Sequence, residues 1–210
     1  MNVAVTLEEV GQGALPTASE AGPAPKRIVF AYGFWLFLLS DIVMFAALFA
    51  AYAVLVRATA GGPAGVQLFH QGSVAIETAC LLVSSYTCGL MSLAADSRRR
   101  DGTYFFAIVT FALGAVFVAL ELHEFAGMIA VGAGPQRSAF LSAFFTLVGC
   151  HGVHVTLGIL WLLTMVAQVF AKGYRADILR RVLCFALFWH TLDIIWVAIF
   201  TVVYLLGAGQ

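Results

Sequence analysis

Eight of the ionisable side chains within the long apolar stretches of this chain are candidates for a site, because a charged group there is costly and needs a functional or structural reason. They are Asp41, Glu77, Glu121, Glu124, His151, His154, His190 and Asp193. Six of the eight form pairs separated by three residues, and residues at this spacing share one face of a helix. We therefore expect these side chains to turn toward the interior of a helix bundle.

The depth of these groups follows from the rise along a helix. At about 1.5 Å per residue, Glu77 lies about 7 Å inside the outer end of its apolar segment. Glu121 and Glu124 lie near the outer end of theirs. We expect the three carboxyl groups to occupy one outer layer, and the other five groups to lie nearer the middle of the membrane.

Histidine ligation of haem is one chemistry that this set allows. Two histidines that face each other across a bundle at one depth can bind haem, and His151 or His154 opposite His190 would supply them. A proton path through Asp41 or the glutamates is another possibility. In the third interpretation the groups hydrogen-bond one another and hold helices together, each bond contributing about 0.6 kcal/mol. We favour this structural interpretation.

A di-metal carboxylate site is a further alternative, with Glu77, Glu121, Glu124 and a histidine as ligands. Such sites usually take Glu-x-x-His motifs from two helices, whereas Glu121 and Glu124 form Glu-x-x-Glu. His123, beside them in the sequence, points to another side of the helix. The pattern therefore disfavours this site, and we expect no catalytic, cofactor-binding or metal-binding residue in the chain.

Five apolar segments carry these residues, at about 28–56, 73–95, 104–129, 139–171 and 182–206. Of the 210 residues, 62% are hydrophobic and 10% are charged, whereas a soluble domain is about one quarter charged. Each segment exceeds the length of about 20 residues that spans the hydrocarbon, and backbone groups in lipid must bond internally. The fold class is therefore an all-α integral membrane protein with five transmembrane helices. A net charge of +0 gives no reason to expect nucleic acid as a partner.

The N-terminal residues differ from the rest. Residues 1–27 lack an apolar core and a basic start, so we expect a flexible tail rather than a signal peptide, followed by a transmembrane domain over residues 28–210. Nine of the 11 lysines and arginines fall on one side of the expected membrane: Lys26, Arg27, Arg98, Arg99, Arg100, Lys172, Arg175, Arg180 and Arg181. The positive-inside rule places that side, with the N-terminus, in the cytoplasm, and the C-terminus in the periplasm.

Four sequence stretches resemble one family of membrane proteins. They are GFWLFLLSDIVMFAALFAAYAVL (33–55), TAGGPAG (59–65), GPQRSAFLSAFFTLVGCHGVHVTLGILW (134–161) and LFWHTLDIIWVAIFTVVYLLG (187–207). They are similar to subunit III of cytochrome o (bo-type) ubiquinol oxidases, in the haem–copper terminal oxidase superfamily that includes cytochrome c oxidase subunit III. The resemblance runs from about residue 32 to residue 207 and leaves out the tail.

The resemblance implies a subunit of a respiratory complex in the bacterial cytoplasmic (inner) membrane. Such complexes pump protons while they oxidise quinol and reduce oxygen to water. Haem and copper are expected in the partner subunit I, and subunit III carries no redox centre. The other expected partners are subunit II, a small subunit IV and bound phospholipid. The function implied is support of assembly, stability and lipid binding next to subunit I.

The resemblance also implies roles for the buried polar residues, as structural or lipid-cleft groups. Asp41 falls where many cytochrome c oxidases carry a buried, carbodiimide-reactive glutamate, and the aspartate resembles the quinol-oxidase pattern. Subunit III of a bacterial cytochrome c oxidase is the nearest alternative. A freestanding membrane haem protein is the alternative from another class.

Overall fold

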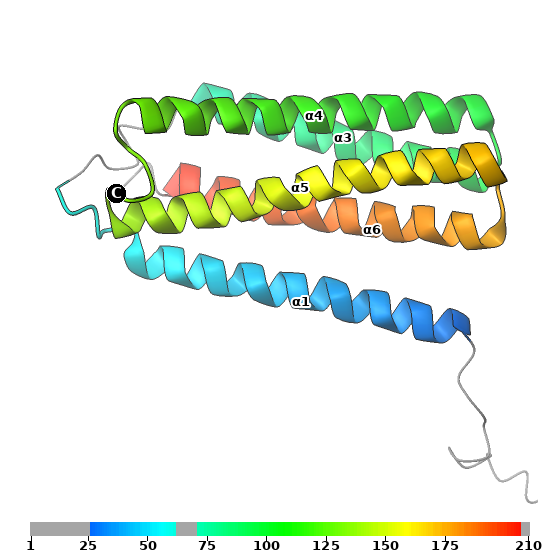
Figure 1. Ribbon diagram of the computed structural model, residues 1–210, viewed down its shortest axis with the longest axis horizontal. Coiled ribbons are helices and arrows are strands. Elements are labelled where there is room, and N and C mark those ends of the chain that lie inside the picture. The colour runs from blue at the N-terminus through cyan, green and yellow to red at the C-terminus, as the bar shows by residue number, and fades with distance from the viewer. Residues whose placement is uncertain (1–25, 62–70, 207–210) are drawn as a thin grey trace, which may run out of the picture. The chain divides into compact units, whose positions relative to one another are not determined.

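The computed structural model describes residues 26–61 and 71–206, and no strand occurs among them (Figure 1). The helices are α1 (Lys26–Leu55), α3 (Gln71–Asp96), α4 (Arg100–Ala130), α5 (Ala139–Lys172) and α6 (Ala176–Ile199), with α6 continued by the π-helical η1 (Phe200–Leu206). By length and composition, five helices could cross a membrane. This confirms the all-helical class and the five apolar helices. Of the tail expected over residues 1–27, residues 1–25 lie outside the part of the chain that the structure describes.

The chain divides into two units, residues 1–37 and residues 38–210. The described part of the first unit is the beginning of α1, where the rings of Phe34 and Phe37 lie 6.2 Å apart. Its side chains are mostly exposed and apolar, among them Tyr32 and Trp35. An apolar surface of this kind suits contact with lipid or with another membrane-spanning chain.

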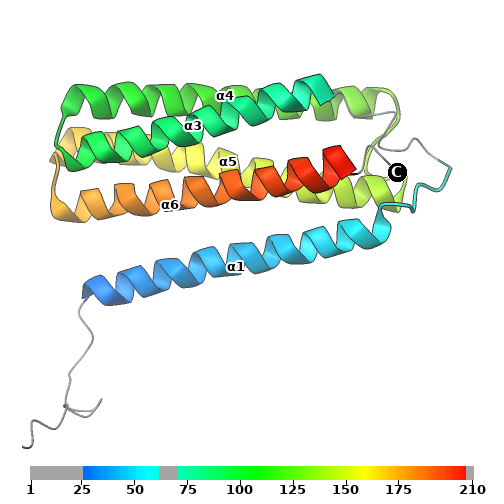
Figure 2. The same ribbon diagram turned by 180° about the vertical axis from the view of Figure 1, so that it is seen from behind.

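Within the second unit, α3, α4, α5 and α6 form a four-helix bundle. Each helix packs against two others, so that the order around the bundle is α3, α4, α5, α6 and back to α3. Figure 2 shows the four helices running side by side along their length. The connections from α3 to α4 and from α5 to α6 are a few residues long, which fixes these helix pairs as antiparallel neighbours.

Two helices begin at least four residues earlier than hydropathy indicated. The third expected helix was placed from residue 104 and the fifth from residue 182, whereas α4 begins at Arg100 and α6 at Ala176. Hydropathy detects only the part of a helix inside hydrocarbon, and these first turns are polar. Each carries an aspartate, Asp101 or Asp177, which the positive end of the helix dipole favours.

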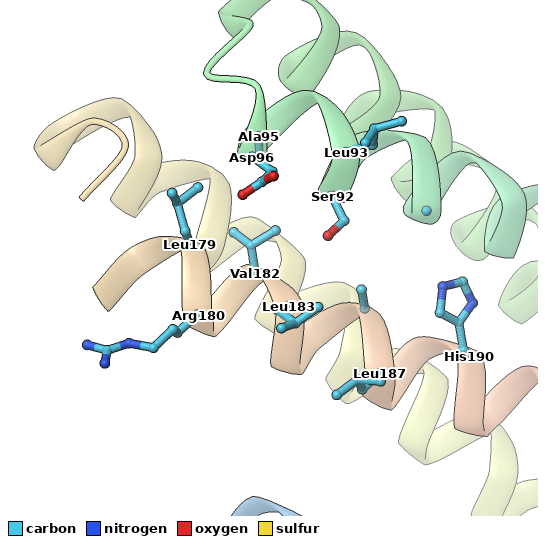
Figure 3. A pocket seen from close by; sticks show the side chains of 12 residues that line it. Ser92, Leu93, Ala95, Asp96, Leu179, Arg180, Val182, Leu183, Leu187 and His190 are labelled. Carbon is cyan, nitrogen blue, oxygen red and sulfur yellow. The ribbon is translucent and has the colours of Figure 1, made fainter. Parts of the chain in front are cut away.

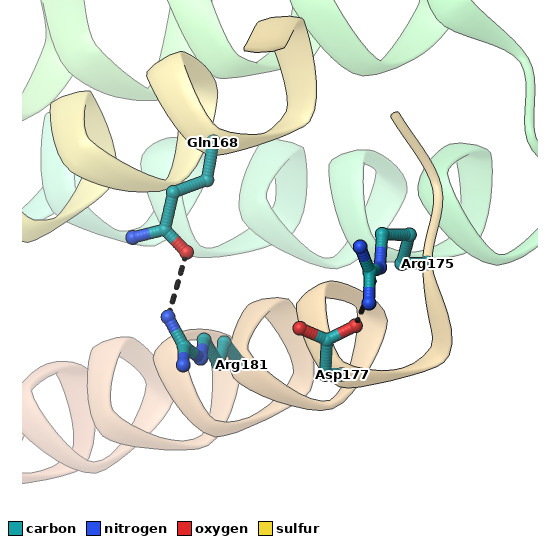
Figure 4. Close-up of polar contacts among 4 residues, drawn as sticks. All are labelled: Gln168, Arg175, Asp177 and Arg181. Atoms are coloured by element: carbon teal, nitrogen blue, oxygen red, sulfur yellow. Dashed lines mark hydrogen bonds and ion pairs between the residues drawn. The ribbon is translucent and has the colours of Figure 1, made fainter. Parts of the chain in front are cut away.

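Polar contacts hold the early start of α6 in place (Figure 4). Arg175 pairs with Asp177 at 3.4 Å, and Arg181 Nη1 donates to Gln168 Oε1 at 2.9 Å, which joins α6 to the end of α5. Both contacts are exposed, and exposed pairs contribute about 0–1 kcal/mol. They therefore fix the direction of the turn more than they stabilise the bundle.

Trp189 of α6 lies at the point where all four helices of the bundle meet. Its side chain is 1% exposed, and its Nε1–H donates to Ser84 Oγ of α3 at 2.9 Å. A Cβ atom on Gly114 of α4 would lie 3.0 Å from the indole, and one on Gly158 of α5 would lie 2.8 Å from it. The two glycines thus form the slot that admits the ring.

Further hydrogen bonds between hydroxyl and indole groups follow the same helices. Trp196 Nε1–H donates to Thr78 Oγ1 at 3.0 Å, about two helical turns beyond Trp189. The hydroxyls of Thr87 and Thr110 lie 2.8 Å apart and join α3 to α4. With no hydrophobic driving force between helices in lipid, close packing and such bonds hold a bundle together.

Candidate functional site

The three glutamates come together within the bundle. Glu77 of α3 interacts electrostatically with Glu124 of α4, and Glu121 of α4 interacts with both. Glu77 is 1% exposed and Glu121 is 3% exposed. Among the described residues, no lysine, arginine or histidine forms an ion pair with these carboxyl groups. We call the three side chains the carboxyl layer.

Two tyrosines adjoin the carboxyl layer. Tyr204 of η1 interacts electrostatically with all three glutamates and with Tyr52 of α1. Both tyrosines are buried, and Tyr52 is 2% exposed. Sequence reasoning missed them because a phenol in an apolar segment carries no formal charge to mark it. The sequence signal that the two tyrosines share is their position. Each lies within three residues of a helix end, at the depth estimated for the glutamates.

A glycine on α5 makes room for one carboxyl group. A Cβ atom on Gly152 would lie 2.5 Å from Glu121 Oε2 and 2.6 Å from Oε1. The carboxyl group of Glu121 therefore lies directly against the α5 backbone. The sequence shows a glycine between two histidines, but only the packing shows that the absence of a side chain there makes room for the Glu121 carboxyl group.

The two histidines of α5 have different surroundings. His151 is fully buried, with its ring stacked on Trp196 at 5.2 Å and edge-on to Phe117 at 5.8 Å. His154 is half-buried, and its Nδ1–H donates to the carbonyl oxygen of Cys150 at 2.7 Å. These two rings are enclosed by aromatic groups or bound to their own helix.

Asp41 of α1 lies near this histidine pair. Its carboxyl group interacts electrostatically with His154, whose ring lies 5.3 Å from that of Phe45. One carboxyl oxygen of Asp41, Oδ2, is buried without a hydrogen-bond partner. Asp41 therefore belongs with the histidines of α5 rather than with the carboxyl layer.

His190 and Asp193 of α6 meet at one serine of α3. Ser85 Oγ lies 2.7 Å from His190 Nδ1, and the same hydroxyl hydrogen-bonds Asp193. In a nucleophilic triad the acid would instead orient the far nitrogen of the histidine. This arrangement therefore joins α3 to α6 and does not activate the serine. Sequence reasoning missed Ser85, because serines are common in apolar segments.

A groove between α3 and α6 runs from these groups toward one end of the bundle (Figure 3). Its volume is about 600 Å³, and leucine, valine and alanine side chains make up most of its wall. His190 lies at one end of the groove, and Asp96 and Arg180 lie at the other. The groove is thus apolar along its length and carries both signs of charge at its mouth.

The surroundings of the histidines do not fit a haem. The ring of His151 is packed between aromatic rings, and the facing nitrogen of His190 is bound to Ser85. In residues 26–61 and 71–206, no group of three or more histidine, cysteine, aspartate or glutamate side chains has the geometry to hold a metal ion. His190 and Asp193 hydrogen-bond Ser85 of the neighbouring helix. Both ring nitrogens of His151 and both carboxyl oxygens of Glu121 are instead buried with no hydrogen-bond partner among the described residues.

Replacing Ser85 with alanine is expected to weaken the contact between α3 and α6, because the change removes the partner of both His190 and Asp193. Two membrane hydrogen bonds at about 0.6 kcal/mol each predict a loss of about 1 kcal/mol. Thermal denaturation in detergent would measure it. Ser92→Ala, on the same helix and in the groove wall, is the matched control. An equal effect of the two substitutions would contradict the assigned role.

Comparison with known proteins places these features in a family. Residues 22–208 match the family described as cytochrome c oxidase subunit III. The chain is 53% identical over 177 residues to the cytochrome bo(3) ubiquinol oxidase subunit 3 of Pseudomonas aeruginosa, covering 84% of this chain and 85% of that one. It is 43% identical over 180 residues to the quinol oxidase subunit 3 of Bacillus subtilis, covering 84% and 87%. The chain belongs to the cytochrome c oxidase subunit III family.

Proposed function

We propose that this chain is subunit III of a proton-pumping haem–copper ubiquinol oxidase of a bacterial cytoplasmic membrane. The observation that carries the proposal is the 53% identity to a ubiquinol oxidase subunit 3 over most of both chains. Subunits 3 of quinol oxidases from Pseudomonas putida and Bacillus subtilis are also similar, at 49% and 43% identity. These names favour quinol over cytochrome c as the electron donor of the complex.

The role of this subunit is structural and not redox. The arrangement that supports this role is the pairing of polar groups across helices, as in Trp189 with Ser84 and His190 with Ser85. Large apolar side chains such as Val43, Val54 and Phe170 remain exposed and suit contact with lipid and with partner chains. Haem and copper belong to the partner subunit I, and subunits II and IV complete the complex.

The N-terminus lies in the cytoplasm and the C-terminus in the periplasm. The distribution of basic residues supports this orientation. Arg98 and Arg99 lie in the connection from α3 to α4 and Arg175 lies in the connection from α5 to α6. These two connections are at the same end of the α3–α6 bundle (Figure 1). The end of a membrane-spanning bundle that carries more lysine and arginine stays on the cytoplasmic side of the membrane.

Phospholipid binds this subunit, and the groove between α3 and α6 is suited to it. Leu183 and Leu187 offer apolar surface for an acyl chain. Arg180 and Asp96 at the mouth would meet the phosphate and the amine of a zwitterionic headgroup. Lipid analysis of the purified complex, with Arg180→Ala against Arg175→Ala as control, tests this assignment by loss of one bound lipid.

Co-purification is the experiment that tests the function. The tagged chain, purified from its own membranes in mild detergent, is expected to bring larger subunits and their haem spectrum. Haem should leave with those subunits when harsher detergent removes them, and the complex should oxidise ubiquinol. Oxidation of cytochrome c instead would identify a cytochrome c oxidase. Stoichiometric haem on this chain alone would contradict the structural role.

Asp41→Asn is expected to leave steady-state quinol oxidation largely intact in the assembled complex. Asparagine has nearly the same shape and stays neutral, and Asp41 interacts electrostatically with His154 of this same chain. Oxygen consumption with ubiquinol as donor would measure the effect. Complete loss of turnover in a fully assembled complex would show that Asp41 carries protons needed for catalysis.

A further inference from the structure

Five elements of the second unit contribute to the surroundings of the carboxyl layer. The contributors are Tyr52 of α1, Glu77 of α3, Glu121 and Glu124 of α4, Gly152 of α5 and Tyr204 of η1. The last element is π-helical, a form that is rare and frequently occurs at functional sites. Polar groups from this many helices do not converge by the demands of apolar packing alone.

The hydrogen-bonding capacity of this region exceeds what its neighbours use. Tyr52 is 2% exposed, and its hydroxyl oxygen has no hydrogen-bond partner among the described residues. Glu77 Oε2 and both carboxyl oxygens of Glu121 and of Glu124 are likewise buried without a partner. Buried polar groups of native proteins are almost always satisfied by protein or by ordered water. A polar ligand is therefore required here.

The chemistry of the ligand follows from the groups around it. Three carboxyl groups in electrostatic contact, with no basic ion-pair partner among the described residues, cannot all be ionised in a buried site, because like charges oppose one another. The described side chains have no metal-binding geometry. Water both donates and accepts hydrogen bonds, and it is small enough for a site enclosed by five elements.

We propose that the carboxyl layer, with Tyr52 and Tyr204, is a binding site for internal water and excess protons. The carboxyl groups share protons, and bound water links them to the two phenols. Gly152 belongs to the site because a side chain there would displace the carboxyl group of Glu121. The site goes beyond the proposed function, since it depends neither on the electron donor nor on a redox centre.

The position of the site allows exchange with one side of the membrane. Glu77 lies in the second turn of α3, and Tyr204 lies two residues before the end of η1. Both are thus within about 10 Å of helix ends, at a rise of about 1.5 Å per residue. Protons held here exchange with the aqueous phase at that end and not at the end that carries Asp96 and Arg180.

Infrared spectroscopy of the whole purified oxidase tests the proposal. Spectra of wild type, Glu77→Gln, Glu121→Gln and Glu124→Gln are compared in H2O and in D2O. At least one glutamine substitution is expected to remove a C=O stretching band of a protonated carboxyl group, and that band should shift in D2O. Asp96→Asn, exposed at the other end, is the control and should leave the band unchanged.

Two spectral results from the glutamine variants would overturn the proposal. One is that all three glutamine variants lose only bands of ionised carboxylate; the other is that the lost band does not shift in D2O, which would mean a dry site. A stoichiometric divalent metal, removed by chelator together with these spectral changes, would also overturn it. If a glutamine variant fails to assemble, Tyr52→Phe provides a second test. This substitution is expected to shift the C=O band of the protonated carboxyl group. An unshifted band would count against the site. Quinol oxidation and co-purification report separately on the proposed function.

Discussion

Trp189→Ala is expected to produce a large loss of stability of the bundle, on the order of 3 kcal/mol. The side chain is 1% exposed and contacts α3, α4 and α5. Because lipid is as apolar as the protein interior, the cost comes from the cavity and the lost packing rather than from transfer to water. The Ser84 hydroxyl also loses its hydrogen-bond donor, the indole N–H of Trp189.

Thermal denaturation and retention of the subunit in increasingly harsh detergent would measure this loss. Phe170→Ala is the matched control, because Phe170 is a large aromatic residue of α5 that is 82% exposed. Trp189→Phe should fall between the two, since it fills most of the slot but lacks the N–H group. If Trp189→Ala and Phe170→Ala destabilise equally, the slot between Gly114 and Gly158 does not hold the bundle together.

Gly152→Ala is the second large effect, with an expected destabilisation of about 1–3 kcal/mol from overpacking. The added methyl group would lie 2.5 Å from Glu121 Oε2, and the carboxyl group could move away only within an enclosed space, because Glu121 is 3% exposed. Gly149→Ala, one turn earlier on α5, is the control, because its added methyl group would meet Phe125 at an ordinary 3.5 Å.

A double-mutant cycle separates this contact from a general loss of helix packing. Introduced together with Glu121→Ala, Gly152→Ala should cost much less than it does alone, with a coupling energy of about 0.5–3 kcal/mol. Denaturation of the four variants in one detergent gives the coupling. Strictly additive effects would mean that the two residues do not touch, and would remove Gly152 from the proton and water site.

The fold class and the number of helices followed from the sequence because both depend on a local property. A hydrocarbon layer requires about 20 apolar residues with internally bonded backbone, and five segments meet that requirement. Helix starts were less accurate, as the six-residue error at Ala176 shows. The first turns of α6 lie in a polar environment, where hydropathy no longer distinguishes helix from loop.

The charged candidates for the site were visible in the sequence, and their uncharged partners were not. Glu77, Glu121 and Asp193 stand out because a charge in an apolar segment is rare. Ser85 and Tyr52 do not, because hydroxyl groups are common in membrane helices and their partners lie far away in the sequence. His190 and Ser85, for example, are 105 residues apart.

The sequence by itself determined that this chain spans a membrane with five helices, which residues are costly to bury there, and which family it resembles. Only the tertiary structure decided which helices are neighbours, and therefore that Glu121 lies against Gly152 while Asp41 lies near His154. The physical reason is that burial of a charge is a property of one residue in one solvent, whereas a contact depends on the rotation and depth of two helices. Those are set by packing over the whole bundle, through slots such as the one that Gly114 and Gly158 form around Trp189.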